Sequence, residues 1–336
     1  MIYLEKNHEL FKKHKEVLTK QLQKVIKELL SPNHNEKNKG FYIREKERKL
    51  LIYIKSRLDI FIGTSIPMQK RLIKIFKREY PELTKSYAKK ELQPNIYKVI
   101  SYLFVDKGYN FFTKVTKTKS YHAYTFVKAL NLKSCPSCNI SYIAFLEKEE
   151  NNDKTKQRRA ELDHFFPKSV YPFLAVNFYN LIPSCSTCNK LKSDDDLYEL
   201  LNPYDSKVKN IKFNFWLNNV DFLDNPKLDN TTFSDEENIK IEIKNLPKEN
   251  LDTFQLERIY QAHTDVVVEL ILKQMHYPEI YVQKLADLGF SKEEIYRFVF
   301  ANYLKEKEWS KRPMAKLIYD ISEELGLIDN IPERGK

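Results

Sequence analysis

Residues 161–193 read ELDHFFPKSVYPFLAVNFYNLIPSCSTCNKLKS, and this stretch decides the fold that we expect for the middle of the chain. Two short runs within and beside it, AELDHFF and YNLIPS, are rich in apolar and aromatic residues that suit strands, and Pro167 closes the first run. The segment from Cys185 to Ser193 follows the second run and can begin a helix. The stretch therefore predicts the order strand, loop, strand, helix.

The cysteines of the chain fall into two pairs with C-x-x-C spacing, CPSC at 135–138 and CSTC at 185–188. Each pair places two thiolates on one tight turn, and Zn²⁺ favours four such ligands in a tetrahedron. The alternatives are a redox dithiol or two unrelated buried pairs. A zinc ion with four protein ligands has no open position for a substrate, so we expect it to be structural and any chemistry to lie beside it. The predicted zinc ligands are Cys135, Cys138, Cys185 and Cys188.

Polar residues with catalytic potential surround the second cysteine pair. Asp163 and His164 end the first strand-like run, where neighbouring side chains point to opposite faces. Asp163 and Asn189 offer hard oxygen ligands that suit Mg²⁺, while a neutral His164 can take a proton from water. Taken singly, each residue is more often a cap, a packing side chain or a turn former. Together, and next to the predicted zinc ligands, these residues predict a metal-dependent active site.

At these residues the sequence resembles the HNH endonuclease family, the ββα-metal or His-Me finger nucleases, in its zinc-bearing form. The resemblance covers about residues 131–203 and rests on LDHFFPKS, YNLIPSC and CSTCNKLKS, with CPSC upstream. The third residue of the motif is Asn where the family name has His, a variant that favours Mg²⁺ over softer ions. The resemblance implies hydrolysis of nucleic-acid phosphodiester bonds.

The resemblance also implies a role for each motif residue of this chain. Asp163 and Asn189 would ligate a catalytic Mg²⁺ or Mn²⁺, and His164 would be the general base. Asn180 would fasten the loop between the two strands and orient the histidine backbone. Lys192 would lie near the substrate phosphate. An unperturbed imidazole loses its proton at about pH 6 to 7, so cleavage is expected to rise through that range.

The loop between the two expected strands departs from many family members because it lacks their Gly pair and reads PKSVYPFLAVNF. This loop sequence, together with the later segments YQAHTDVVVEL and KRPMAKLIYDI, resembles the HNH proteins that accompany ATPases in Septu-type anti-phage systems. The likeness implies an ATPase partner protein and a role in anti-phage defence. We expect the aromatic residues of the loop to fill a small core around the zinc: Phe165, Phe166, Tyr171, Phe173 and Phe178.

The positive charge of the chain is concentrated at its N-terminal end. Residues 1–130 hold 29 Lys and Arg against 12 Asp and Glu, a net of +17, whereas the rest holds 28 against 34, a net of −6. Such a basic excess attracts polyanions through phosphate contacts and counterion release. The alternative is a Lys-rich composition that only solvates helix faces. We expect residues 1–130 to contribute to nucleic-acid binding, with double-stranded DNA as the predicted partner.

Apolar periodicity predicts an α+β fold, a mainly helical chain with a central zinc-stapled ββα module. Helical patterns run from Leu10 to Leu30, from Ile43 to Phe61, after Pro67, and from Leu251 to Leu327; strand-like segments are ISYIAFLE, IKFNFWL and NIKIEIKNL. We divide the chain into three parts. These are a basic helical region at 1–130, the nuclease module at 131–205, and a strand segment with C-terminal helices packing on the module at 206–336.

The composition excludes several classes of protein. With 336 residues and 42% hydrophobic residues the chain can bury a core, and it contains no apolar run of membrane-spanning length. The first sixteen residues, MIYLEKNHELFKKHKE, carry no signal-peptide pattern, so we expect a cytoplasmic protein. The rival to a nuclease is a non-catalytic, zinc-stapled adaptor that binds DNA or a protein. An adaptor needs the cysteines but not the Asp163–His164 pair.

Overall fold

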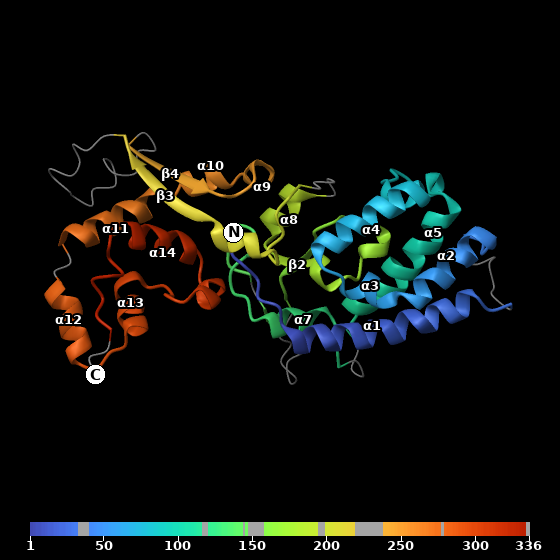
Figure 1. Ribbon diagram of the computed structural model, residues 1–336, viewed down its shortest axis with the longest axis horizontal. Coiled ribbons are helices and arrows are strands. Elements are labelled where there is room, and N and C mark those ends of the chain that lie inside the picture. Colours follow the sequence, from blue (N-terminus) through green and yellow to red (C-terminus); the bar gives the residue numbers. More distant parts are fainter. Residues whose placement is uncertain are drawn as a thin grey trace. The chain divides into compact units, whose positions relative to one another are not determined.

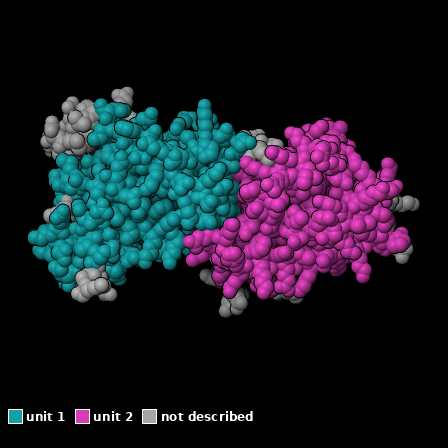
Figure 2. Space-filling view, viewed as in Figure 1, with its two compact units in different colours: residues 1–4, 132–143, 199–336 teal, residues 5–131, 144–198 magenta. Residues whose placement is uncertain are grey.

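The computed structural model describes residues 1–32, 40–115, 120–143, 145–146, 158–193, 199–218, 238–276 and 279–333. The chain divides into two compact units, shown in Figure 2: unit 1 comprises residues 1–4, 132–143 and 199–336, and unit 2 comprises residues 5–131 and 144–198. The predicted boundaries near residues 130 and 205 stay predictions. Most of the expected linker at 148–159 lies outside the described residues.

Unit 2 begins with the helices that the apolar periodicity predicts (Figure 1). The first is capped by the Asn7 side chain, which accepts a hydrogen bond from the Leu10 backbone N–H at 2.9 Å. The stretch predicted as one helix at 43–61 is divided in two, because the backbone at Arg57 leaves the helical region with φ −135°. The helices of unit 2 up to residue 131 are α1 His8–Leu29, α2 Glu45–Ser56, α3 Leu58–Gly63, α4 Ile66–Glu79, α5 Asn95–Ser101, α6 Asn110–Thr113 and α7 Ala123–Leu130, with short 3₁₀ turns η1 Pro81–Thr84 and η2 Lys90–Leu92.

One element of unit 2 is a π-helix, η3, which spans Tyr102–Tyr109 between α5 and α6. π-Helical turns are rare and are frequently found at functional sites. Gly108 lies within this turn, and a Cβ at that position would lie 3.0 Å from the Val176 Cγ1 atom and 3.3 Å from the Leu103 carbonyl oxygen. The glycine therefore allows η3 to approach the loop at Val176 closely.

The middle stretch folds as an antiparallel hairpin followed by a helix, in the order that the sequence predicts. Strand β1, Glu161–His164, pairs with β2, Leu181–Ser184, so that Asp163 lies opposite Ile182 and His164 opposite Leu181. Helix α8, Ser186–Lys192, follows directly. Short 3₁₀ turns interrupt the connecting loop at η4, Pro172–Leu174, and η5, Phe178–Asn180.

The loop between β1 and β2 forms the core of unit 2. Phe173 stacks on Phe76 of α4 with ring centroids 4.3 Å apart and meets Phe61 of α3 edge-on. Phe178 meets Phe11 of α1 and Phe126 of α7 in the same edge-on manner. The expectation that the loop aromatics fill a small core around the zinc was therefore wrong for Phe173 and Phe178, and for Phe165, Phe166 and Tyr171 it stays a prediction. The apolar faces of the N-terminal helices need a partner, and the loop supplies it.

Unit 1 contains a second antiparallel hairpin and the C-terminal helices, as the sequence predicts. Strand β3, Lys212–Leu217, pairs with β4, Ile239–Lys244, and helix α14, Ala315–Glu324, packs on β3. The predicted strand ISYIAFLE forms only isolated bridges, at Tyr142 and Leu146, in its described part. The remaining elements of unit 1 are η6 Ser206–Asn210, α9 Lys248–Phe254, α10 Leu256–Gln261, α11 Thr264–His276, α12 Glu279–Asp287, α13 Lys292–Phe300, η8 Glu306–Lys311 and α14 Ala315–Glu324. None of the described helices is long and apolar enough to cross a membrane.

Candidate functional site

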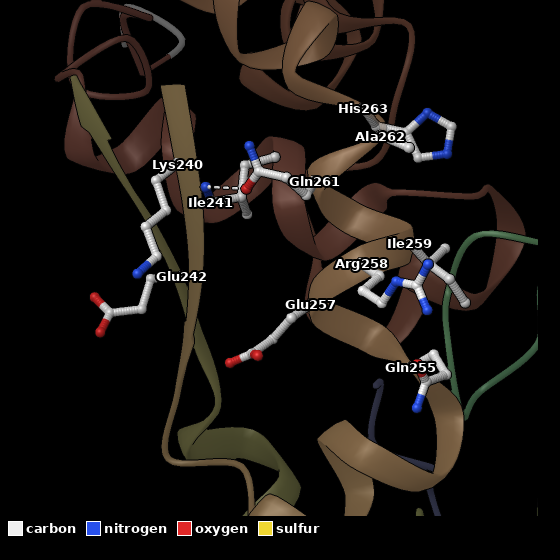
Figure 3. Close-up of a pocket in the computed structure, with 10 residues that line it drawn as sticks. All are labelled: Lys240, Ile241, Glu242, Gln255, Glu257, Arg258, Ile259, Gln261, Ala262 and His263. Atoms are coloured by element: carbon white, nitrogen blue, oxygen red, sulfur yellow. Dashed lines mark hydrogen bonds between the residues drawn. The ribbon is translucent and has the colours of Figure 1, made fainter. Parts of the chain in front are cut away.

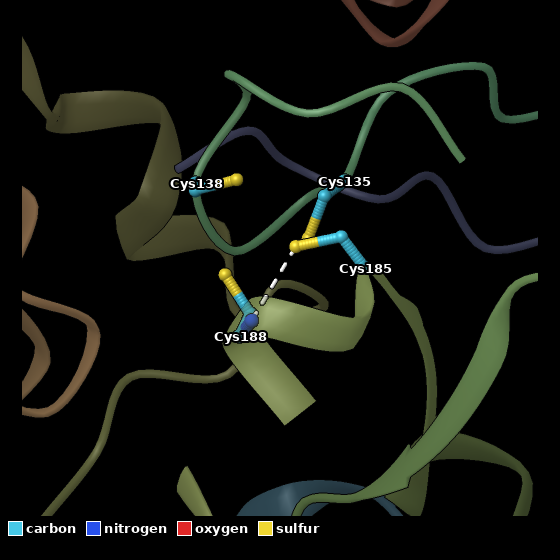
Figure 4. A group of neighbouring side chains, drawn as sticks. All are labelled: Cys135, Cys138, Cys185 and Cys188. Carbon is cyan, nitrogen blue, oxygen red and sulfur yellow. Dashed lines mark hydrogen bonds between the residues drawn. The ribbon is translucent and has the colours of Figure 1, made fainter. Parts of the chain in front are cut away.

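The four cysteines form one buried cluster (Figure 4). Their Sγ atoms all lie within 4.8 Å of one another. A tetrahedral ion with Zn–S bonds of about 2.3 Å places its sulfurs roughly 3.8 Å apart, so the cluster needs little adjustment to hold a metal ion such as zinc. The sequence predicted this grouping, and the structure confirms that the four side chains meet.

Local hydrogen bonds shape both cysteine turns. In the first turn, the Asn139 N–H donates to the Cys135 carbonyl at 2.7 Å and the Ile140 N–H donates to Cys138 Sγ at 3.4 Å. Asn139 adopts φ +55°, a left-handed conformation that asparagine tolerates. In the second turn, Cys185 is the N-cap of α8 and its sulfur accepts from the Cys188 N–H at 3.4 Å. The second cysteine pair therefore also fixes where α8 begins.

Asp163 and Lys192 form a buried ion pair between β1 and α8. The Lys192 Nζ atom lies 3.1 Å from Asp163 Oδ1, and it also donates to the His164 carbonyl oxygen at 2.7 Å. Lys192 is only 1% exposed and Asp163 6%. Lys192 thus contacts protein groups in this structure, and its predicted role near a substrate phosphate stays a prediction. Breaking such a pair leaves a buried charge and typically costs about 3 to 5 kcal/mol.

His164 is fixed by one hydrogen bond and is neutral at physiological pH. Its Nε2 atom lies 3.0 Å from the Ala175 carbonyl oxygen. A carbonyl only accepts, so Nε2 carries the proton and Nδ1 keeps its lone pair. Burial, together with the charges of Lys168 and Lys192, lowers the pKa of His164 to about 3, against the raising effect of the Ala175 bond. The predicted rise of activity through pH 6 to 7 rests on an unperturbed imidazole, which this site does not contain.

Asn180 holds the ends of the β1–β2 loop together. Its Oδ1 accepts from the Phe166 N–H at 2.7 Å, and its Nδ2 donates to the carbonyl oxygens of Phe166 and Leu174 at 3.0 Å each. The backbone carbonyl of Asn180 accepts from the Phe165 N–H at 2.9 Å. Phe165 directly follows His164 in the chain, and Leu174 directly precedes Ala175. The side chain therefore secures both backbone segments that determine the position of the imidazole.

Asn189 faces β1 from α8. Its Nδ2 atom donates to Glu161 Oε2 at 2.7 Å, which orients the amide and fixes which of its two ends is the oxygen. Glu161 and Asp163 lie two residues apart, so they share one face of β1. Asn189 and Lys192 lie three residues apart, so they share one face of α8. The sequence analysis did not single out Glu161, because an exposed glutamate in a short strand belongs to no motif that marks it as a site residue.

A cavity of about 400 Å³ brings the candidate residues together. Asp163, His164 and Asn189 all line it, although Asp163 points toward α8 and His164 toward η3. Two hard oxygen donors beside a space of this size suit a hydrated Mg²⁺ ion that keeps several waters. Lys168 and Lys190 also line the cavity and were not singled out from the sequence. Their positive charges suit a phosphate group.

An aromatic side chain from the N-terminal helices also reaches the candidate site. The ring of Tyr109, at the end of η3, meets the ring of His164 edge-on with centroids 4.5 Å apart. The Lys168 ammonium lies 5.6 Å from the centroid of the same tyrosine ring. Tyr109 precedes His164 by 55 residues, and no local sequence pattern joins the two.

A larger cavity, of about 760 Å³, lies in unit 1 beside β4 and α10 (Figure 3). Its lining mixes cations and anions, among them Lys240, Glu257 and Arg258. The Gln261 side chain accepts from the Ile241 N–H at 3.1 Å and also donates to the backbone of β4. None of the site residues predicted from the sequence lines this cavity, so the smaller one is the better candidate site.

Comparison with known proteins gives one partial likeness. No family model matches the chain, and no solved structure matches it. A segment of 65 residues is 43% identical to the Septu protein PtuB of Bacillus thuringiensis. This segment covers 18% of the present chain and 25% of that relative, so the match spans about a quarter of the protein it resembles.

Proposed function

We propose that this chain is a metal-dependent HNH-type endonuclease that hydrolyses phosphodiester bonds of nucleic acid, with DNA as the substrate. The observation that carries the proposal is the convergence of Asp163, His164 and Asn189 on one cavity with a lysine-lined wall. The order strand, loop, strand, helix around them is the arrangement that the resemblance to the HNH family implies. A non-catalytic adaptor would not require this convergence.

The residues of the chain divide the proposed chemistry among them. Asp163 and Asn189 would hold a Mg²⁺ ion, which supplies charge stabilisation for the departing oxygen when bound. His164 presents an unprotonated Nδ1 because Ala175 holds the proton on Nε2, so it can accept a proton from the attacking water. Lys168 and Lys190 would bind phosphate oxygens. The positive charge of Lys168 is one cause of the low pKa of His164. A bound phosphate would offset that charge, so the pKa of His164 would rise and the imidazole would be a stronger base.

The cysteine cluster would hold a structural Zn²⁺ in this proposal. All four thiols are buried and close enough to saturate a tetrahedral ion, which leaves no position for a substrate. The ion would stabilise the start of α8 through Cys185 and Cys188, and α8 carries Asn189. The proposed roles of the two metals are therefore different: zinc shapes the helix that presents a ligand, and magnesium serves the reaction.

We further propose that the nuclease acts in anti-phage defence together with an ATPase partner protein. The partial match to a Septu protein supports this setting. The loop sequence PKSVYPFLAVNF, which resembles that of HNH proteins of Septu-type systems, also supports a role in anti-phage defence. A nuclease with no control would damage its own cell, so a requirement for a partner fits the proposed activity.

The test is a plasmid-nicking assay of wild type and His164→Ala, with and without Mg²⁺, and with the partner ATPase present. Removal of a general base typically lowers the rate by about 10²- to 10⁴-fold, so nicking should fall by that order. Metal content and DNA affinity should stay near wild type, while the loss of a buried ring and its bond to Ala175 lowers the unfolding midpoint without unfolding the protein. Asp163→Ala should also lose activity, but it leaves the buried Lys192 charge unpaired, so its unfolding midpoint should fall as well. Asp163→Asn keeps an oxygen that can face Lys192 and the metal, so added Mg²⁺ should partly restore this variant and should not restore the His164 variant. A folded His164→Ala protein that still nicks at the wild-type rate would refute the assignment.

A further inference from the structure

We propose that Tyr109 is a positioning residue for the imidazole of His164, so that the N-terminal helical region completes the active site. The inference rests on the proposed nuclease function. Its first support is the edge-on contact between the two rings, whose centroids are 4.5 Å apart with an interplanar angle of 65°. At this distance and angle the two rings are in direct contact in a favourable geometry.

The imidazole needs a second restraint besides its hydrogen bond. The bond from Nε2 to the Ala175 carbonyl oxygen fixes one ring atom, but a ring held at a single atom can still tilt about that point. The Tyr109 ring packs against the imidazole and opposes such a tilt. A catalytic group must be held within about 0.5 Å of its productive position, and packing is one of the means by which proteins achieve this.

The backbone around Tyr109 is built to reach the loop that holds His164. Tyr109 ends the π-helix η3, and Gly108 lets that turn approach Val176. Val176 directly follows Ala175, whose carbonyl oxygen is the hydrogen-bond partner of His164. The close approach of Gly108 to the Val176 side chain therefore lies between the two restraints on the imidazole, one residue from the Ala175 acceptor and one residue from the Tyr109 ring.

The polar surroundings of Tyr109 connect it to the cationic wall of the cavity. The Lys168 ammonium lies over the tyrosine ring at 5.6 Å from its centroid, and Lys168 lines the cavity beside His164. Burial raises the pKa of the Tyr109 hydroxyl, and the positive charge of the nearby Arg159 guanidinium opposes this shift. A substitution that removes the ring thus removes the packing surface of the base, whereas Lys168 keeps its charge beside the cavity.

The experiment compares Tyr109→Leu, Tyr109→Phe and the matched control Tyr102→Leu in the full chain. Tyr102 belongs to the same π-helix and is also half-buried, but it packs on Phe41 at 5.1 Å instead of on His164. The readouts are kcat for nicking, DNA affinity, the unfolding midpoint, and the ring-proton resonances of His164 in the DNA-free protein. A misplacement on the order of 1 Å can lower the rate about 10²-fold, so we expect kcat of Tyr109→Leu to fall about 10- to 100-fold with DNA affinity unchanged.

Two further results support positioning: Tyr109→Phe, which keeps the ring, recovers most of the lost rate, and Tyr102→Leu leaves the rate unchanged. Equal rate losses in Tyr109→Leu and Tyr102→Leu, in step with lower unfolding midpoints, would overturn the proposal in favour of general packing. Wild-type kcat in Tyr109→Leu would overturn it as well. If wild type itself never cuts, the nuclease proposal fails, and the resonances alone decide: shifted His164 signals in Tyr109→Leu support the contact, and unshifted signals overturn it.

Discussion

Two buried histidines of unit 2 bind consecutive carbonyl groups of the β1–β2 loop. The Nε2 atom of His164 lies 3.0 Å from the Ala175 oxygen, and the Nε2 atom of His14, in α1, lies 2.8 Å from the Val176 oxygen. His14 also has its Nδ1 atom 2.9 Å from the Tyr121 hydroxyl, so both ring nitrogens are engaged. The loop backbone is thus held on one side by β1 and on the other by the N-terminal helix.

The neutral state of His14 predicts that acid destabilises the protein. Burial lowers the pKa of His14 to about 4 from an ordinary value of 6.5, against the raising effect of the Val176 bond. The folded form therefore binds a proton less readily than the unfolded chain, and stability is lost as the pH falls below 6.5 toward 4. The contribution of His14 to this loss between pH 7 and 4.5 is about 2 to 3 kcal/mol.

Urea unfolding at pH 7 and pH 4.5 measures this effect in wild type and in His14→Gln. Glutamine keeps an amide donor but does not titrate, and all other groups, His164 included, contribute equally to both proteins. The loss of unfolding free energy on acidification should therefore be smaller in the variant by the stated amount. The same loss in both proteins would show that His14 does not distinguish the folded from the unfolded state by its protonation.

At the scale of elements, α8 joins the cysteine cluster to the candidate active site. Its N-cap, Cys185, belongs to the cluster, while Asn189 and Lys192 on the same helix contact Glu161 and Asp163 of β1. A shift at the start of a seven-residue helix moves all of its side chains. Metal binding at the cysteines is therefore expected to control the geometry at Asn189.

Cys185→Ser should lower metal content, stability and nicking together. Serine can still cap α8, because its hydroxyl accepts from backbone N–H groups, so loss of the cap alone does not explain a large effect. Binding of a structural zinc contributes directly to folding free energy. Metal analysis should give close to one zinc per wild-type chain and clearly less in the variant, with a lower unfolding midpoint. Ser186→Ala, at the exposed first position of α8, is the control and should keep its metal. Full zinc content in Cys185→Ser would contradict a four-thiol site.

Helices, strands and the cysteine cluster could be predicted where short-range patterns in the sequence determine them. The 3.6-residue periodicity predicted α1, and the alternating run IKFNFWL predicted β3, because each buries one face. The C-x-x-C pairs predicted the cluster, since Zn²⁺ requires four ligands. The strand expected at ISYIAFLE forms only isolated bridges in its described part, which begins directly after the cysteine turn and Asn139 at φ +55°.

Contacts between distant residues could not be predicted in this way. The pairs Tyr109–His164 and His14–Val176 join residues 55 and 162 positions apart, and a single sequence offers no pattern for either. Phe173 and Phe178 were assigned to the wrong core for the same reason. Their burial was predictable from composition, but the helices against which they pack were not.

At the scale of the whole molecule, the basic N-terminal helices bury their apolar faces in the core and expose their basic residues at the surface. Helix α4 buries Leu72, Ile73 and Phe76, and Phe76 stacks on Phe173 of the loop. Deleting residues 1–130 would remove this core, so a loss of DNA binding in such a deletion would not distinguish charge from unfolding. Substitution of exposed basic residues separates the two effects.

Helix α4 offers the substitution because Arg71, Lys74 and Lys77 are exposed while its other face is buried. Changing all three to Gln should weaken DNA binding and leave the unfolding midpoint near wild type. Each lost phosphate contact lowers the slope of log affinity against log salt by about 0.9, so we expect the slope to fall by about 1 to 3. Binding isotherms at four or more salt concentrations measure it.

The matched control changes three exposed lysines of unit 1 to Gln and removes the same net charge: Lys248, Lys284 and Lys307. If the N-terminal helices bind the phosphate backbone, the slope falls only in the α4 variant, because only contacts that release counterions enter it. Equal falls in both variants would mean that net charge, and not the α4 surface, attracts DNA. An unchanged slope in the α4 variant would mean that these residues contact no phosphate, and the basic excess of residues 1–130 would then require another explanation, such as solvation of the helices.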